Sequence, residues 1–270
     1  MKPAIRVHQL ACSYYRTPVL RDLTFAVNPG ECFIVIGPNG SGKTTLIKTL
    51  AGLLPVSGGD IFVQDRPLRR HKKADFSRRV AYVAQTGAED SPFSVREMVL
   101  MGRAPYLGVL GVEGAADLEI ARQAIAFTGL SHLSGRPMAS LSGGERQRAH
   151  IARAICQRPE IILLDEPTAA LDLAHQIRIM DLMAGLKNEH GTTVVMVSHD
   201  INLAAMYADR LLLLVEGRAA ACGPPAEVID EKRLAGAYGC RLLVDRSPAG
   251  PWPRVSLVPD TEVGGRKSEV

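Results

Sequence analysis

A glycine-rich stretch that ends in a lysine and a threonine carries the strongest chemical signal in the sequence. Residues 37–44 read Gly-Pro-Asn-Gly-Ser-Gly-Lys-Thr and fit the phosphate-binding pattern GxxxxGK[ST]. Glycines let the backbone wrap a polyphosphate, the Lys43 ammonium adds positive charge, and the Thr44 hydroxyl can ligate magnesium. An ordinary glycine-rich turn does not need these two residues in register. The expected phosphate contacts are Gly37, Pro38, Asn39, Gly40, Ser41, Gly42, Lys43, Thr44 and Thr45.

Polar residues also follow two apolar runs further along the chain. Asp165 and Glu166 come directly after residues 161–164, and His199 follows residues 194–197. In an α/β sheet the carboxyl ends of the strands form the edge that binds ligands. We predict that Asp165 holds magnesium and that Glu166 orients and polarises an attacking water, because phosphoryl transfer needs mainly positioning and charge neutralisation. His199 could contact the terminal phosphate, although a lone histidine is more often an ordinary surface or core residue.

The elements that must position these groups read as an α/β fold with a mainly parallel sheet covered by helices. Residues 1–30 alternate in polarity, which favours antiparallel strands, and residues 85–141 show helical segments but no convincing strand. After Gly223, the prolines of residues 247–253 predict turns between two short strands, followed by a frayed end at 261–270. Buried strands are predicted at 32–36, 161–164, 194–197 and 211–215. Helices are predicted at 43–52, 116–127, 145–157, 173–188 and 201–207.

Composition excludes several other classes of protein. The chain has 270 residues, 46% hydrophobic and 22% charged, which is enough apolar side chain to close a real core. A net charge of +4 is too small over this length to indicate nucleic-acid binding, and no nucleic acid is expected as a partner. Five cysteines without a CxxC pair are typical of reduced, mostly buried thiols in the cytosol. No apolar run approaches the roughly 18 residues of a membrane span, so any membrane role is expected to be peripheral.

Residues 141–148, Leu-Ser-Gly-Gly-Glu-Arg-Gln-Arg, are not needed by a generic phosphate-loop protein. With them the chain resembles the ATP-binding cassette (ABC) ATPases, whose signature is LSGGQ; Glu145 stands at the last place of that motif. Ser142, Gly143 and Gly144 open a helix, so their small side chains expose backbone N–H groups that can bind an anion. A simple helix cap would explain Ser142 but not the paired glycines.

The resemblance covers roughly residues 4–225 and implies roles for further residues. Tyr14, or the adjacent Tyr15, is similar to the aromatic residue that stacks on adenine. Gln85 resembles the Q-loop glutamine, which contacts magnesium and the nucleophilic water. Asp172, in Ala-Leu-Asp at residues 170–172, resembles the D-loop that crosses the dimer interface, and His199 matches the switch histidine. The implied catalytic residues are therefore Glu166, His199 and Gln85, and the implied metal ligands are Thr44, Gln85 and Asp165.

The implied fold is a P-loop NTPase core with a mainly parallel sheet, an N-terminal antiparallel β subdomain and an inserted α-helical subdomain. We expect an ATPase domain over residues 1–225, with the helical part at about 86–141, and an extension over 226–270 packed on the core. The implied cofactors are ATP and Mg²⁺. In a head-to-tail pair of copies, each ATP lies between one phosphate loop and the other copy's signature, and Ser142, Gly143, Gly144, Glu145 and Asp172 contribute in trans.

The resemblance also implies a transport role at the cytoplasmic face of the inner membrane. The partners would be permease subunits and, indirectly, a substrate-binding protein. Residues 95–108 and the later Tyr238-Gly239 resemble the subfamily that serves importers of iron chelates, haem and cobalamin, with ferric siderophore ranked first and molybdate behind. Residues 86–110 are either the permease-docking surface or internal packing of the helical lobe.

Two rival functions differ in class. A soluble ABC protein acting on DNA or ribosomes would usually carry two cassettes, or coiled-coil or zinc insertions, and this chain shows neither. A P-loop kinase that phosphorylates a small metabolite would need an acceptor pocket and no signature at residues 141–145. ATP-dependent dimerisation separates the kinase from the ABC ATPase, since a kinase cycle needs no ATP sandwich.

Overall fold

A six-stranded sheet lies at the centre of the computed structural model, which describes residues 2–15, 17–85, 92–108 and 111–259. The strand order is β10-β9-β3-β8-β7-β6; all neighbours are parallel except β10, which pairs antiparallel with β9. The strands are β3 (Cys32–Ile36), β6 (Val80–Val83), β7 (Ile161–Asp165), β8 (Thr193–Val197), β9 (Arg210–Val215) and β10 (Arg218–Gly223). The predicted mainly parallel sheet is confirmed, and each of the four predicted buried strands is present.

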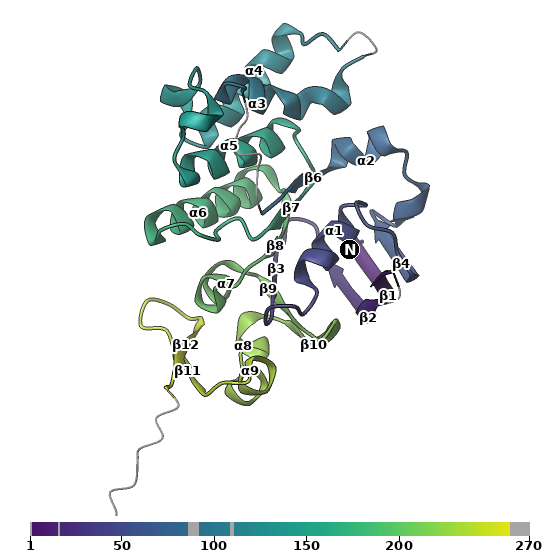
Figure 1. The fold of residues 1–270 in the computed structure, drawn as a ribbon, viewed down its shortest axis with the longest axis vertical. Helices are drawn as coiled ribbons and strands as arrows, with labels where there is room; N and C mark the ends of the chain where they lie inside the picture. The colour runs from purple at the N-terminus through teal and green to yellow at the C-terminus, as the bar shows by residue number, and fades with distance from the viewer. Residues whose placement is uncertain (1, 16, 86–91, 109–110, 260–270) are drawn as a thin grey trace, which may run out of the picture.

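Both faces of this sheet are buried, which is why its strands read as continuous apolar runs. In β3, Cys32, Ile34 and Ile36 belong to one hydrophobic cluster, while Phe33 and Val35 belong to another on the opposite face. The first cluster is covered by helices that contribute apolar side chains to it (Figure 1). These helices are α5 (Gly143–Cys156), α6 (Leu173–His190), α7 (Ile201–Tyr207), α8 (Pro225–Val228) and α9 (Glu231–Tyr238).

The opposite face packs against α1 (Lys43–Leu50) and a four-stranded antiparallel sheet of order β2-β1-β4-β5. In β1, Ile5 and Val7 are buried whereas Arg6 and His8 are exposed, the alternation typical of a half-buried strand. The predicted N-terminal antiparallel strands are thus confirmed. The strands are β1 (Ile5–Tyr14), β2 (Thr17–Val27), β4 (Gly58–Val63) and β5 (Arg66–Pro67), followed by η1 (Leu68–Arg70) and α2 (Lys73–Arg79).

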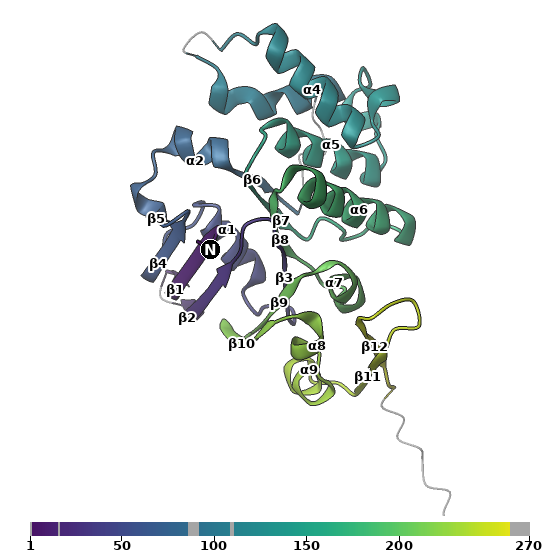
Figure 2. The same ribbon diagram turned by 180° about the vertical axis from the view of Figure 1, so that it is seen from behind.

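A helical lobe with its own hydrophobic cluster lies at one end of the molecule, at the top of Figures 1 and 2. Its elements are α3 (Val95–Leu100), η2 (Met101–Tyr106), α4 (Ala115–Phe127), η3 (Ser131–Leu133), η4 (Met138–Ser140) and α5. The described residues between 92 and 141 form no strand, only one bridge between Ser94 and Pro137. The sequence-based expectation of helices without strands in this stretch is confirmed for the residues that the structure describes.

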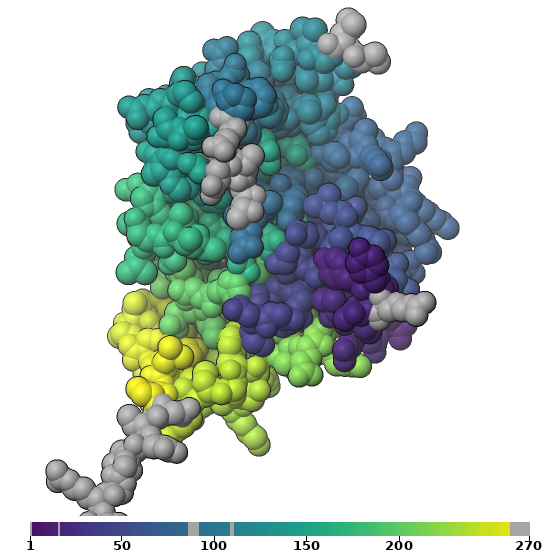
Figure 3. All heavy atoms as spheres, in the orientation of Figure 1, coloured from purple at the N-terminus to yellow at the C-terminus, as the bar shows by residue number. Residues whose placement is uncertain are grey.

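The C-terminal segment forms a hairpin at the end of the molecule away from the helical lobe (Figure 3). Strands β11 (Leu242–Arg246) and β12 (Pro253–Leu257) flank the proline-rich turn, as predicted. Asn202 of α7 ties the hairpin to the core, because its side chain donates to the Val255 carbonyl at 3.1 Å and accepts from the Val255 N–H at 2.8 Å. The predicted frayed end, residues 261–270, lies outside the described residues. Among the described helices, none combines the length and apolar character that a membrane crossing requires.

Candidate nucleotide site

The phosphate loop connects β3 to α1, and its backbone explains two of its glycines. Gly37 has φ 150°, and a Cβ there would collide with the carbonyl oxygen of Leu214 on the neighbouring strand β9. Gly42, the residue before α1, has φ 102° and leaves no room for a side chain beside Leu20. Only glycine fits both positions without strain. The loop therefore brings backbone N–H groups to the helix N-terminus, an arrangement that suits an anion.

Lys43 is buried within this loop. Its Nζ donates to the carbonyl oxygens of Gly37 and Pro38, both at 2.8 Å. Burial lowers the pKa of Lys43, and the negative charges of Glu166 and Asp165 oppose that shift. The ammonium thus bonds to neutral carbonyls, contacts that a phosphate oxygen can replace with a stronger, charge-assisted bond.

Asp165 ends β7 inside the protein and is surrounded by hydroxyl groups. Thr44 Oγ1 donates to Asp165 Oδ1 at 3.1 Å, and the Tyr82 hydroxyl donates to Oδ2 at 3.4 Å. Burial raises the pKa of Asp165, and burial together with this carboxylate raises the pKa of Tyr82 to about 12. Within the described residues Asp165 forms no ion pair. A buried carboxylate and an adjacent hydroxyl are oxygen ligands that fit Mg²⁺, whose charge would offset the burial of the carboxylate.

Glu166 lies between Gln85 and His199, the glutamine and histidine that the sequence analysis predicted to be catalytic. Gln85 Nε2 donates to Glu166 Oε2 at 2.6 Å, and His199 Nε2 lies 2.5 Å from Glu166 Oε1. The three residues follow β6, β7 and β8, so the carboxyl edge of the sheet brings them together across long distances in sequence. Glu166 has φ 51°, a left-handed conformation that costs a non-glycine residue about 1 kcal/mol or more and is found most often at functional sites.

Residues 142–145 open helix α5 in the helical lobe. The Ser142 Oγ caps the helix by accepting from the Glu145 N–H at 3.3 Å, and the Glu145 carboxylate accepts from the Ser142 N–H at 2.9 Å. The Ser142 N–H and the Ser142 hydroxyl, which donates to Glu145 Oε2 at 2.8 Å, lower the pKa of Glu145. Among the described residues, no hydrogen bond joins this segment to the phosphate loop.

Asp172 and the two adjacent tyrosines are further predicted contacts to the nucleotide. Asp172 is the N-cap of α6 and accepts from the His175 N–H at 2.8 Å. Tyr14 ends β1 with a side chain that is 43% exposed, and the adjacent Tyr15 is fully exposed. Within the described chain neither tyrosine is hydrogen-bonded to the loop, so the geometry leaves the choice between them open.

Tyr82 is the site residue that sequence reasoning missed. It lies on β6 opposite Leu163 of β7, and its hydroxyl reaches Asp165. The only available signal was an aromatic residue three places before Gln85, within the apolar run at residues 80–84. That signal does not show which face of the sheet the ring occupies. Packing of the ring in the hydrophobic core was equally compatible with it.

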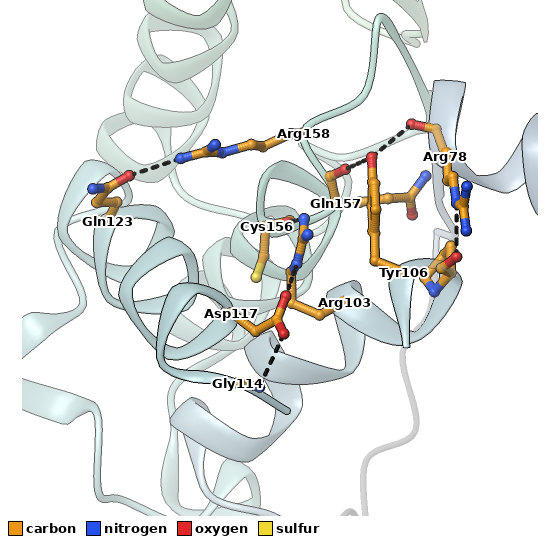
Figure 4. Close-up of polar contacts among 10 residues, drawn as sticks. Arg78, Arg103, Tyr106, Gly114, Asp117, Gln123, Cys156, Gln157 and Arg158 are labelled. Carbon is orange, nitrogen blue, oxygen red and sulfur yellow. Dashed lines mark hydrogen bonds and ion pairs between the residues drawn. The ribbon is translucent and has the colours of Figure 1, made fainter. Parts of the chain in front are cut away.

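Residues 86–110 divide between surface and interior, and 86–91 and 109–110 lie outside the described residues. Arg103 is buried: its Nε donates to Asp117 Oδ1 at 2.8 Å and its Nη1 to the Cys156 carbonyl at 3.0 Å (Figure 4). The Tyr106 ring packs with its centroid 3.9 Å from Arg103 Cζ. Phe93 and Met101 are exposed. Around Arg103 the structure therefore shows internal packing of the lobe.

The fold and the order of these groups along it define a phosphate-loop ATPase with an inserted helical lobe. In comparison with known families, residues 20–169 match the ABC transporter family. The hemin import ATP-binding protein HmuV of Rhodococcus jostii (strain RHA1) is 40% identical over 244 residues, which is 90% of this chain and 82% of that one. The ferric enterobactin transport ATP-binding protein FepC of Escherichia coli (strain K12) is 35% identical over 251 residues, 93% of each chain.

Solved structures of ABC transporter proteins are also similar to this chain. A metal-chelate type ABC transporter in an inward-facing conformation aligns with a TM-score of 0.85 and 30% identity, covering 96% of this chain and 98% of the other. A dimeric ATP-binding cassette in a post-hydrolysis state, bound to ADP and phosphate, aligns with a TM-score of 0.71 and 26% identity, covering 82% and 98%. The chain belongs to the ABC transporter family and is one of its ATPase subunits.

Proposed function

We propose that this chain is the ATP-hydrolysing subunit of a membrane importer for an iron chelate, haem or cobalamin. The observation that carries the proposal is the position of Glu166. Its carboxylate lies at the carboxyl edge of the sheet beside the phosphate loop, bonded to Gln85 and His199. A carboxylate that two polar side chains fix in place can orient and polarise a water for attack on a terminal phosphate.

The residues around Glu166 divide the remaining work. The loop N–H groups and the Lys43 ammonium bind and orient the phosphates of ATP, with residues 37–45 forming the cradle. Thr44 and Asp165 hold Mg²⁺, together with Gln85, whose amide oxygen is not used in its contact with Glu166. When bound, Mg²⁺ neutralises phosphate charge. His199 positions the Glu166 carboxylate and can contact the terminal phosphate.

The complete site requires a second copy of the chain. Ser142, Gly143, Gly144 and Glu145 lie in the helical lobe, and no hydrogen bond within the described residues links them to the loop. In a head-to-tail pair, this segment and Asp172 would meet the ATP held by the other copy. The dimeric cassette bound to ADP and phosphate is a related protein that pairs with a second copy, which supports this arrangement. Binding of ATP would close the pair and hydrolysis would open it.

The cargo and the membrane partners are inferred from the relatives. The names of these relatives include hemin, ferric enterobactin, achromobactin and cobalamin, and we rank ferric siderophore first. The chain would bind permease subunits at the cytoplasmic face of the inner membrane, and indirectly serve a substrate-binding protein. We propose an ATPase domain over residues 1–225, with the helical part at about 86–141, and a C-terminal extension over 226–270. Among the residues that the structure describes, the exposed Phe93 and Met101 are our candidates for contact with the permease.

The substitution Glu166→Gln tests the proposal. It preserves shape and hydrogen-bonding capacity but removes the carboxylate, so we expect ATP binding to persist while the hydrolysis rate falls about a hundredfold or more. The variant should accumulate as an ATP-bound dimer, which size-exclusion chromatography with multi-angle light scattering can measure. Glu113→Gln, an exposed glutamate in the helical lobe, is the matched control. Turnover at the parental rate in Glu166→Gln would overturn the proposed role of Glu166.

Co-purification tests the transport role separately. The tagged chain, extracted in detergent from source membranes, should recover a many-helix permease identifiable by mass spectrometry. Recovery of ribosomal or DNA-bound proteins alone would instead favour a soluble ABC ATPase.

A further inference from the structure

The imidazole of His175 occupies the space next to Gly144 in the signature segment, residues 141–145. A Cβ atom added to Gly144 would lie 2.7 Å from His175 Cγ and 2.9 Å from its Nε2, and closer still to Cδ2. Real Cβ atoms essentially never lie at such distances, so a side chain at position 144 would force the His175 ring to move. Gly144 is itself buried. A contact within the same chain therefore disfavours any larger residue at this position.

The same imidazole is bonded to the aspartate of the D-loop, residues 170–172. His175 Nδ1 lies 2.8 Å from Asp172 Oδ1 and 2.9 Å from Oδ2, and the Asp172 carboxylate also accepts from the His175 N–H. These hydrogen bonds lower the pKa of Asp172. The histidine side chain is 28% exposed and the aspartate 67% exposed, so the ring is largely covered while the carboxylate remains at the surface.

The Leu171 side chain of the D-loop also lies near the start of α5. A Cβ atom added to Gly143 would come within 3.9 Å of Leu171 Cδ2, an ordinary van der Waals distance. Leu171, just before α6, and His175, in its first turn, therefore both lie beside the start of α5.

We infer that His175 is a positioning residue that fixes the first turn of α5 relative to the D-loop. The inference rests on the proposed ATP-bound pair of copies, in which both segments act on the nucleotide of the other copy. Because His175 contacts Gly144 and Asp172 together, the two segments approach the second copy as one unit. Without the ring, each would have to be ordered separately when the dimer forms, and that ordering weakens association.

The experiment measures ATP-dependent dimerisation in the Glu166→Gln background, with ATP affinity of the monomer measured in parallel. His175→Ala should weaken dimer association about tenfold, the effect of losing roughly one hydrogen bond and its packing, and leave monomer ATP affinity unchanged. His175→Asn keeps a donor near the Nδ1 position, and His175→Phe keeps a ring. Each should lose less than His175→Ala, because each retains one of the two contacts.

A double substitution separates a contact within the chain from a contact with phosphate. Gly144→Ala should abolish most dimerisation, since its methyl group collides with the ring. In Gly144→Ala/His175→Ala the methyl group no longer meets the ring, so the Gly144→Ala change should cost less association than it does when His175 is present. If the change costs as much association without the ring as with it, the ring does not restrict position 144, and the inference is wrong.

Two further measurements keep this result distinct from misfolding and from failure of the proposed function. In an otherwise parental chain, the ATPase rate of His175→Ala should recover at higher protein concentration with an unchanged KM for ATP, which a folding defect would not allow. Ser142→Arg serves as the dimer-deficient control. If Glu166→Gln alone fails to dimerise with ATP, the proposed function is at fault. If Glu166→Gln dimerises and His175→Ala in that background dimerises equally well, the inference about His175 is at fault.

Discussion

The nucleotide site and the helical lobe both bury charged side chains, but they neutralise the charges differently. In the site, Lys43 donates to two backbone carbonyls and Asp165 accepts from two hydroxyls. Within the described residues neither has an oppositely charged partner at ion-pair distance. In the lobe, the buried Arg103 guanidinium is paired with the Asp117 carboxylate at 2.8 Å.

Arg103 and Asp117 also make further contacts around their ion pair. Arg103 also donates to the Cys156 carbonyl, and the Tyr106 ring lies over its guanidinium, while Asp117 accepts from the Gly114 N–H (Figure 4). The guanidinium hydrogen bond and the Gly114 N–H lower the pKa of Asp117. The Arg103 Nε and Nη1 donors and both Asp117 carboxylate oxygens thus have partners within the same chain, which is the arrangement expected of a structural element.

The difference shows which buried charges are available to a ligand. A charge paired with a full opposite charge contributes to folding and has little to gain from an anion or a cation. A charge bonded to neutral groups can exchange them for a charged ligand, and the exchange is favourable because charge-assisted hydrogen bonds are about twice as strong. Substitutions in the site should therefore change ligand binding, and substitutions in the lobe should change stability.

Of the substitutions that follow, Lys43→Ala should have the largest effect, and the effect is on ATP affinity. It removes the ammonium that bonds to phosphate, and hydrogen bonds to charged groups contribute about 1.5–3 kcal/mol, so ATP affinity should fall roughly ten- to a hundredfold. Fluorescent-nucleotide titration measures the change. Lys73→Ala, an exposed lysine at the start of α2, is the matched control and should bind normally. Unchanged ATP affinity in Lys43→Ala would contradict the claim that the buried charges of the nucleotide site are available to a ligand.

Gly102→Ala tests the lobe. A Cβ at residue 102 would collide with the Arg153 carbonyl oxygen and lie 3.1 Å from Cys156 Cβ, both on α5. Overpacking of this kind costs about 1–3 kcal/mol, which chemical denaturation can measure, while ATP affinity should stay the same. Gly135→Ala, where nothing lies within 4 Å of the added atom, should be close to neutral. A variant of normal stability with reduced ATP affinity would contradict the structural role of the lobe cluster.

The sequence could predict the site because strand ends in an α/β sheet converge. Glu166 and His199 are 33 residues apart, yet each follows a predicted strand, and the sheet edge brings their side chains to 2.5 Å. The parallel sheet, the antiparallel edge strands and the helical lobe followed from apolar periodicity in the same way. These features depend on local pattern and on a general rule of topology.

Contacts between helices and loops could not be predicted in this way. Arg103 and Asp117 are both charged residues in a stretch of mixed polarity, and such a stretch suits a docking surface as well as a buried ion pair. Gly144 and His175 lie 31 positions apart without a shared periodicity. Their partners are determined by how three-dimensional packing orients each side chain, which spacing alone does not encode.

Asp165→Asn should stabilise the nucleotide-free protein while weakening Mg²⁺-dependent ATP binding. Burial raises the pKa of Asp165, so the native state holds the ionised carboxylate less readily than the unfolded chain does. This penalty is absent at low pH, where the carboxyl is protonated in both states, and grows as the pH rises through the ordinary aspartate pKa towards the raised one. At pH 7.5 we expect the Tm of Asp165→Asn to rise by about 2–4 °C, the shift that about 1 kcal/mol gives at this size.

Calorimetry over a pH series checks the sign of this effect. The Tm advantage of Asp165→Asn should shrink as the pH falls, and Glu113→Gln, at an exposed position, should show no advantage at any pH. An advantage that grows at low pH would show that the native carboxylate is stabilised, not penalised, and Asp165 would then resemble the paired charges of the lobe.

Tyr106→Phe should have the smallest effect of these substitutions on stability. It tests whether the lobe cluster acts on stability alone and not on the nucleotide site. The Tyr106 hydroxyl reaches the Gln157 carbonyl at 3.0 Å and the Arg78 carbonyl at 3.3 Å, joining the end of α5 to the end of α2 (Figure 4). Phenylalanine keeps the ring over Arg103 and removes only these bonds, so the free energy of unfolding should fall by about 1 kcal/mol. Tyr15→Phe, at a fully exposed position, controls for the loss of a hydroxyl. In the described part of the chain the hydrogen-bond and ring partners of Tyr106 are Arg78, Gln157 and Arg103, none of which belongs to the nucleotide site, so monomer ATP affinity should not change. A decrease would mean that the lobe cluster supports the nucleotide site directly.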